Sequence, residues 1–334
     1  DEEQYSAFFD RAERALEPPP RVESYRGFYF LSWDPEIEDL ITYLDDSRLW
    51  FDDFIDRNAD ANGEIQIIPG SLKLNIHGTW KVLIENTVDS YHFGPTHATF
   101  IQYAASIRHE RFGEGEVPMR ERLKQQFGFD LGHGRGHMSN ARTDIVGNGG
   151  NGQDESAHVG RFRREAVTRY GTMAANIGSF AGNFLIYPNV LFPHGNSIRL
   201  FWPVSPTETE VTVWLAAPKD EPPGDARHER VREYILAQYV AGFQSPDDIE
   251  AIESCSQGHR AVTYPAAQAA QWSDLSLGYH HLTGGHELRM RVFWRRWHAD
   301  IQGPHGLVRT DDWESLDEYE RTMAELRAEP ALRR

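Results

Sequence analysis

The sequence has few cysteines, few basic residues and no long apolar run, and each shortage excludes a class of protein. Its one cysteine, Cys255, cannot form an intrachain disulfide or a metal cluster that needs two or more thiolates from this chain. No apolar run approaches the roughly 18 residues that a membrane-spanning helix needs. We therefore expect a cytoplasmic protein without a membrane segment.

Basic residues are outnumbered by acidic ones, 34 against 51, so the net charge is −17. A field of this sign repels phosphate backbones and anionic lipid headgroups, so neither nucleic acid nor a membrane is expected as a partner. Hydrophobic residues make up 40% of the chain and aromatic residues 12%, which is enough to build a large core. We expect one main domain over residues 1–334.

The order of the expected elements indicates an α+β fold, with an antiparallel sheet wrapped around and covered by helices in a helix-grip arrangement, the cover lying on one side. Helices are expected over 1–17, 35–57 with a break at Asp46-Ser47, 79–93, 227–243, 245–257 and 314–329. Strands are expected over 22–33, 65–69, 72–77, 183–192, 197–204 and 210–217. The Gly-rich, polar stretch 113–160 predicts long flexible loops. No GxGxxG motif follows a strand, which excludes a dinucleotide-binding fold.

Histidines and carboxylates gather between Trp80 and His97. Asp89 and His92 are three residues apart and share one side of the expected helix, which Gly94-Pro95 should break. That break lets His97 turn back, so that two neutral imidazoles can bind one metal ion while Asp89 orients one of them. On spacing alone, two such histidines are more often surface or core residues.

A third, carboxylate ligand would complete the two-histidine, one-carboxylate site of non-haem Fe(II) oxygenases. The run Ser245-Pro246-Asp247-Asp248 offers two candidates, although Ser, Pro and acids are also ordinary at a helix start. The residues alone leave three interpretations open: an iron oxygenase, a helix-grip ligand-binding module without redox activity, and a zinc hydrolase, for which no general base is evident.

The pattern Asn86-x2-Asp89-x2-His92-x4-His97, followed by Gly242-Phe243-x3-Asp247-Asp248, resembles the catalytic domain of Rieske-type aromatic-ring-hydroxylating dioxygenases, large (α) subunit. The stretch around Asp248 and Phe293-Trp294-Arg295-Arg296-Trp297 is similar to the benzoate and anthranilate branch. The resemblance implies that His92, His97 and Asp248 bind Fe(II). It further implies that Asp89 is the bridge by which electrons enter, and that Asn86 sits close to the iron.

The same resemblance implies a terminal oxygenase that inserts O2 into an aromatic ring to give a cis-dihydrodiol, with an aromatic carboxylate such as a benzoate as substrate. Neutral arenes, aryl amines and monooxygenation are the alternatives. A ferredoxin or reductase would supply electrons from NADH, a small β subunit would accompany the chain, and the assembly would be an α trimer or α3β3.

The cluster motifs of that family, Cys-x-His and Cys-x2-His, are absent from this sequence, and Cys255 alone cannot replace them. We therefore expect the [2Fe-2S] cluster outside this chain segment. An upstream domain of a longer α subunit is favoured over another polypeptide, with residues 1–34 as its lead-in. Arg199 resembles a family position that could be structural.

Overall fold

The computed structural model describes residues 4, 14–89, 92–103, 106, 126–131, 136–142, 157–170, 183–193, 195–239, 242–261, 290, 293–294, 296–297 and 300–301. The chain divides into two compact units, Asp1–Tyr43 and Leu44–Arg334. Among the described residues, no helix has the length and apolar character to cross a bilayer.

The first unit contains a two-stranded hairpin. Strand β1 (Arg21–Tyr25) pairs antiparallel with β2 (Phe28–Ser32). The turn residues Arg26 and Gly27 both have positive φ, 50° and 83°, as in the two-residue turns that suit hairpin twist. The single strand predicted over 22–33 is therefore wrong, because this turn folds the aromatic run back on itself. Helix α1 (Leu40–Leu44) follows, and the helix predicted over 1–17 lies almost wholly outside the described residues.

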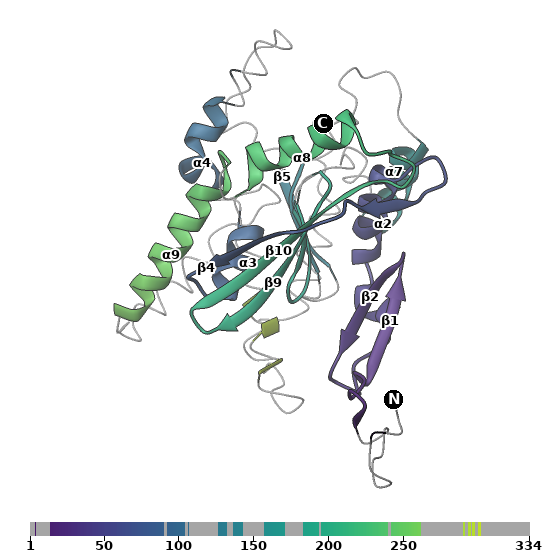
Figure 1. Cartoon of the computed structure of the whole chain (residues 1–334), viewed down its shortest axis with the longest axis horizontal. Helices are drawn as coiled ribbons and strands as arrows, with labels where there is room; N and C mark the ends of the chain where they lie inside the picture. Colours follow the sequence, from purple (N-terminus) through teal and green to yellow (C-terminus); the bar gives the residue numbers. More distant parts are fainter. Residues whose placement is uncertain are drawn as a thin grey trace. The chain divides into compact units, whose positions relative to one another are not determined.

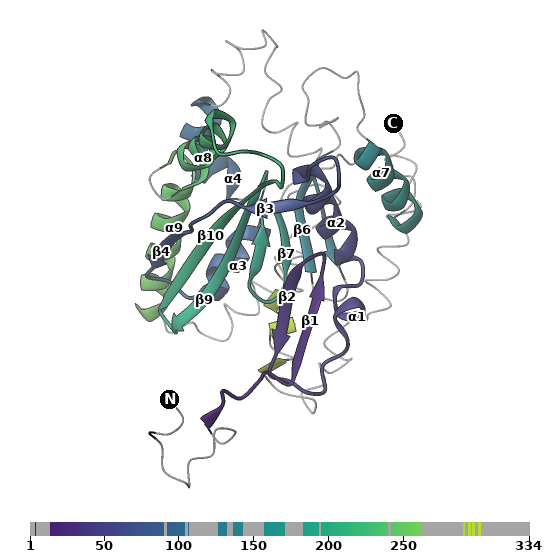
Figure 2. The same cartoon turned by 45° about the vertical axis from the view of Figure 1, so that its right-hand side comes forward.

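The second unit is built on an eight-stranded antiparallel sheet (Figures 1 and 2). Its order is β3-β10-β9-β8-β7-β6-β5, and β4 pairs with β10 beyond the stretch that holds β3. The strands are β3 (Ile65–Ile67), β4 (Leu72–Ile76), β5 (Gln126–Leu131), β6 (Gly136–Arg142), β7 (Asn183–Ile186), β8 (Val190–Phe192), β9 (Ser197–Ser205) and β10 (Glu208–Pro218). The predicted α+β class and its antiparallel meander are confirmed, but the single strand predicted over 183–192 is wrong, because β7 and β8 form an antiparallel hairpin there.

Helices cover the sheet on both faces, where the sequence predicts cover on one. They are α2 (Ser47–Asn58), α3 (Trp80–Val88), α4 (Phe93–Thr96), α7 (Ala157–Tyr170), α8 (Asp225–Gln238) and α9 (Ser245–Ala261). Helix α3 packs on β6, β7, β9 and α9, and α2 packs on β7, β10 and α7. Successive residues of β7 point to opposite faces: Leu185 joins the α3 core, whereas Phe184 stacks on Phe192, which contacts Phe54 of α2. Both faces of β7 are apolar, so both must be covered.

Strands β5 and β6 and the start of α7 lie within 113–160, where the sequence predicts only long flexible loops. Backbone pairing explains the difference, because β6 forms ladders with both β5 and β7. Such pairing is set by neighbouring strands and not by local side-chain periodicity. The helix predicted over 314–329 lies outside the described residues.

Candidate metal centre

The candidate site forms where α3 ends, α4 turns and α9 begins. Helix α3 stops at Val88, and Asp89 follows in extended conformation with ψ 140°. The helix predicted to run to residue 93 is therefore too long, and Asp89 and His92 do not share a helical face. Gly94-Pro95 do not break the helix either, because they lie inside α4, where a proline in the first turn costs no hydrogen bond.

The two histidines flank the one-turn helix α4, with His92 as its N-cap and His97 as its C-cap. On a continuous helix, five residues of separation would turn the side chains far apart. Here the backbone leaves helical geometry at His97, which has φ −100° and ψ 27°. The ring centroids therefore lie 5.4 Å apart with their planes at 74°.

Asp248, in the first turn of α9, meets both imidazoles. Its Oδ1 lies 3.0 Å from His97 Nε2 and 3.5 Å from His92 Nε2. One donor atom from each of the three side chains lies within 4.8 Å of the others. Asn86 of α3 donates a hydrogen bond of 3.2 Å from Nδ2 to the same Asp248 oxygen, so it holds the carboxylate that faces the two rings.

These residues fit a divalent metal ion such as Fe(II). The side chain of His97 is 1% exposed, and neither of its ring nitrogens makes a well-aligned hydrogen bond, although Nε2 lies close to Asp248 Oδ1. Buried polar atoms are normally hydrogen-bonded, so buried imidazole nitrogens without a good hydrogen bond need an explanation. A metal ion bound through Nε2 supplies one, and two imidazoles with one carboxylate form the donor set of non-haem iron sites.

A second carboxylate stands behind each histidine. Asp89 Oδ2 lies 2.9 Å from His92 Nδ1 and accepts the His92 backbone N–H at 3.1 Å. Asp247 Oδ2 lies 3.7 Å from His97 Nδ1, beyond hydrogen-bond distance. A carboxylate hydrogen-bonded to the far ring nitrogen fixes the tautomer of a metal-binding histidine and makes it more basic. The sequence predicts this role for Asp89 and assigns none to Asp247.

The electrostatics of the site favour a bound cation. Burial alone would lower the pKa of His92, but hydrogen bonds and charge from Asp248 and Asp89 raise it to about 9. Burial alone would raise the pKa of Asp248, but the two imidazoles hold it below its usual range. Without a metal, the carboxylates therefore retain a proton on His92, and a metal ion would displace that proton when it binds.

Two adjoining cavities meet at the site. One is lined by the His92, His97 and Asp248 side chains. The other, partly open to solvent, is largely apolar and lies between the sheet and helices α3, α8 and α9. The residues that line both are Asn86, Thr87, Arg199, Ser245 and Asp248. A bound ligand in the apolar cavity would therefore lie next to the candidate metal ligands.

The antiparallel sheet and the converging histidines and carboxylate define a class, an α+β domain with a candidate metal site beside an apolar cavity. The family model for the ring-hydroxylating alpha subunit, catalytic domain, matches residues 70–303. That span includes every residue of the candidate site. The chain belongs to this family.

Two dioxygenase large subunits are relatives at about 30% identity. The chain is 31% identical over 271 residues to the 2-halobenzoate 1,2-dioxygenase large subunit of Burkholderia cepacia, which covers 80% of this chain and 54% of that protein. It is 30% identical over 247 residues to the toluate 1,2-dioxygenase subunit alpha of Pseudomonas putida, covering 73% and 52%. The chain thus spans about half the length of these relatives.

A solved structure supports the fold. Naphthalene 1,2-dioxygenase with indole bound in its active site superposes with a TM-score of 0.63 at 19% identity, covering 98% of this chain and 72% of that one. At this identity the likeness concerns the fold alone.

Proposed function

We propose that the chain carries the terminal oxygenase site of a ring-hydroxylating dioxygenase, which adds O2 to an aromatic ring at Fe(II) held by His92, His97 and Asp248. The observation that carries the proposal is the convergence of two Nε2 atoms and a carboxylate oxygen within 4.8 Å beside an apolar cavity. Three protein ligands leave other coordination positions open for reactants.

Each residue of the site has a distinct part in this proposal. His92 and His97 bind the metal through Nε2, and Asp89 holds the proton on Nδ1 of His92. Asn86 aims Asp248 by donating to its Oδ1. The apolar cavity excludes water and positions the ring. When bound, Fe(II) supplies the redox chemistry of O2 activation, which no side chain provides.

The substrate we propose is an aromatic carboxylate such as a benzoate. The relatives at 30% and 31% identity are named for toluate and 2-halobenzoate, and an anthranilate 1,2-dioxygenase large subunit of Acinetobacter baylyi is 26% identical. Neutral arenes are the alternative, because benzene and biphenyl dioxygenase alpha subunits also match, at 27% and 28%. Aryl amines and monooxygenation stay as further alternatives.

Electrons must come from outside this chain, because a Rieske [2Fe-2S] cluster takes two cysteines and the chain has one. We propose that electrons enter at Asp89. Its Oδ2 lies 2.9 Å from Nδ1 of His92, and His92 would connect it to the metal. A cluster domain on a neighbouring subunit would contact Asp89, which calls for a ring such as an α trimer or α3β3. A ferredoxin or reductase would be the upstream donor.

Iron content and product formation test the proposal together. The full-length protein should retain one Fe(II) per chain and convert benzoate to a dihydrodiol with a reductant. His92→Ala should lose both, whereas His259→Ala, which removes an exposed histidine of α9, should lose neither. A wild-type protein that binds aromatic ligands equally well with and without iron, and whose binding ignores His92→Ala, would instead be a non-redox ligand-binding module.

A further inference from the structure

The apolar cavity has a wall whose chemistry follows from strand register. Directly opposed residues on paired strands point to the same face of a sheet. Val211 lies between Phe201 and Leu74, and all three line the cavity. One row further along, Val213 is paired with Arg199. The cavity wall formed by β9, β10 and β4 is therefore apolar except where it carries an arginine.

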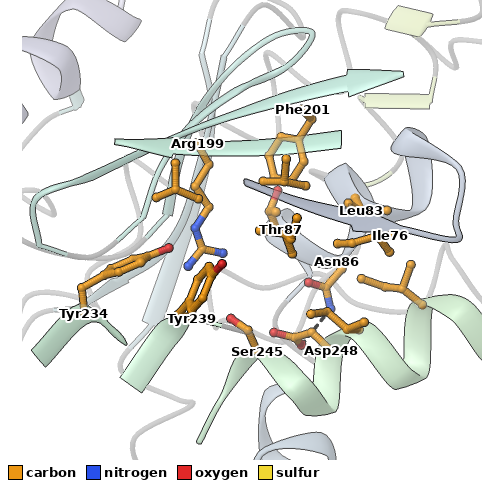
Figure 3. A pocket seen from close by; sticks show the side chains of 15 residues that line it. Ile76, Leu83, Asn86, Thr87, Arg199, Phe201, Tyr234, Tyr239, Ser245 and Asp248 are labelled. Carbon is orange, nitrogen blue, oxygen red and sulfur yellow. Dashed lines mark hydrogen bonds between the residues drawn. The ribbon is translucent and has the colours of Figure 1, made fainter. Parts of the chain in front are cut away.

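Arg199 points from β9 across the cavity toward the helices, as Figure 3 shows. Its Nε is buried, and its side chain lines both the apolar cavity and the one that holds the histidines. Taking a guanidinium out of water costs free energy, whereas a valine or leucine at this position of the sheet would pack without that cost. A position that keeps this charge at the junction of two cavities suits recognition of an anion.

Two tyrosines flank the guanidinium. Tyr234 of α8 lies with its ring centroid 5.9 Å from the Arg199 guanidinium carbon. Tyr239 caps the C-terminal end of α8 and lines the same cavity. Figure 3 shows both hydroxyl groups turned toward the Arg199 side of the cavity. Phenolic hydroxyls donate hydrogen bonds, so they can add to a guanidinium in binding carboxylate oxygens.

The charges around the cavities explain why an anionic substrate needs such an anchor. The chain carries −17 overall, and Asp89, Asp247 and Asp248 gather at the candidate metal site. Of the described residues that line either cavity, Arg199 is the one lysine or arginine. Its planar fork of N–H groups matches a carboxylate, and five donors allow a ligand contact beside any contact within the protein.

We propose that Arg199, assisted by the hydroxyl of Tyr239, binds the carboxylate of the substrate and so determines that this site takes aromatic carboxylates. The aromatic ring of the substrate would then contact Phe201 and Ile249, in the cavity that Asp248 also lines. This inference rests on the proposed function for its metal site but concerns a different property, the choice of ligand.

Binding of benzoate and of nitrobenzene, its uncharged isostere, tests the role of Arg199 as carboxylate anchor without requiring turnover. Equilibrium dialysis under anaerobic conditions should show that Arg199→Met weakens benzoate binding about 10- to 100-fold, as expected for loss of charged hydrogen bonds, and changes nitrobenzene binding less than about twofold. Tyr239→Phe should weaken benzoate binding less, about 3- to 10-fold. Arg164→Gln, an exposed arginine of α7, should leave both affinities unchanged.

Iron content is measured on the same samples, and Arg199→Met should retain it. Unchanged benzoate affinity, an equal loss for both ligands, or loss of iron would each overturn the proposal, since Arg199 would then serve the fold or the metal site. If Arg199→Met fails to fold, Arg199→Lys decides by the same criterion, with a selective loss of benzoate supporting the anchor. A wild-type chain that retains no iron yet binds benzoate through Arg199 would uphold the anchor while refuting the oxygenase.

Discussion

Replacing His97 with leucine should leave the stability of the metal-free protein within about 2 kcal/mol of wild type while abolishing its stabilisation by Fe(II). The His97 side chain is 1% exposed, and neither ring nitrogen makes a well-aligned hydrogen bond, although Nε2 lies next to a carboxylate. A buried polar group without a good hydrogen bond costs about 1–3 kcal/mol of folding free energy. Leucine is similar in volume and has no polar side-chain atom, so it removes this cost without opening a large cavity.

One interaction opposes this gain. His97 Nε2 lies 3.0 Å from Asp248 Oδ1, and leucine loses that attraction. This is not a surface pair, because the side chains of His97 and Asp248 are 1% and 19% exposed, so its loss costs about 1.5–3 kcal/mol, as for a hydrogen bond to a charged group. Asp248 keeps Asn86 at 3.2 Å and His92 at 3.5 Å, so its carboxylate is not left unpaired. The two effects nearly cancel, and the free energy of unfolding of the metal-free variant should change by at most about 2 kcal/mol. For a chain of this size, Tm should shift by at most about 3 °C.

Thermal unfolding followed by circular dichroism, with chelator and with Fe(II) in the absence of air, measures both effects. Wild type at an Fe(II) concentration of about 100 Kd should gain about 2.7 kcal/mol, and the variant should gain nothing. His259→Leu serves as the control, because His259 is exposed on α9. A metal-free His97→Leu protein less stable than wild type by about 2 kcal/mol or more would refute the reasoning, since His97 would then be retained for packing.

Three further outcomes are expected. Asp248→Asn should lose nearly all Fe(II) on desalting while Asp247→Asn keeps most of it, and metal analysis giving the reverse order would assign the ligand to the neighbour. Asp89→Asn should weaken Fe(II) binding only about 10- to 100-fold, yet product formation with a cluster-carrying partner should collapse; near-normal turnover would show that Asp89 is no electron bridge. Gly242→Ala should destabilise by about 1–3 kcal/mol, because a Cβ there would lie 2.6 and 2.7 Å from backbone oxygens of α8. Gly258→Ala, in open space on α9, should instead stabilise by up to about 1 kcal/mol; equal shifts in Tm would contradict the packing argument.

Sequence spacing predicts that His92 and His97 converge, but for a partly wrong geometric reason, and only the family resemblance selects Asp248 as the third residue. The helix break was expected at Gly94-Pro95, whereas α3 already ends at Val88 and the proline lies inside α4. A helix ends where backbone and tertiary contacts end it, and residue preferences mark that point only to within a few positions. The histidines still meet, because the chain leaves helical geometry at His97 in place of the expected break.

Prediction of the fold succeeded in strands rich in β-branched and aromatic residues and failed where backbone pairing decides. Strands β9 and β10 are long and carry such residues, and the sequence predicts both. Strand β6 begins at Gly136 in a glycine-rich stretch and becomes recognisable only through its pairing with β7. In the hairpin, Arg26 and Gly27 are flanked by aromatic residues in the sequence, so the run reads as one strand. Their positive φ angles in the structure show the turn.

The cavity residues could be predicted only in part. Alternation along β9 places Arg199 and Phe201 on the face that also carries Ser197 and Ser205, whereas the opposite face is wholly apolar. The sequence pattern therefore does not single out Arg199 as a cavity residue. What that face meets depends on α8 and α9, which follow β9 only after the whole of β10 and a connecting segment. The side chains that complete the cavity, Tyr239 and Ile249, therefore join Arg199 through tertiary structure and not through any local pattern.

The first turns of α9 connect the metal site to the ligand cavity. Asp248 faces the two histidines, while the next residue, Ile249, and then Ile252 line the apolar cavity. Asn86 ties this helix to α3 through the same Asp248 oxygen that faces the rings. Because adjacent residues of one helix serve both sites, a shift of α9 that changed the ligand cavity would also move the Asp248 carboxylate. We therefore expect metal binding and ligand binding to be coupled through α9, whose acid-rich first turn is the point where the candidate metal site and the apolar cavity meet.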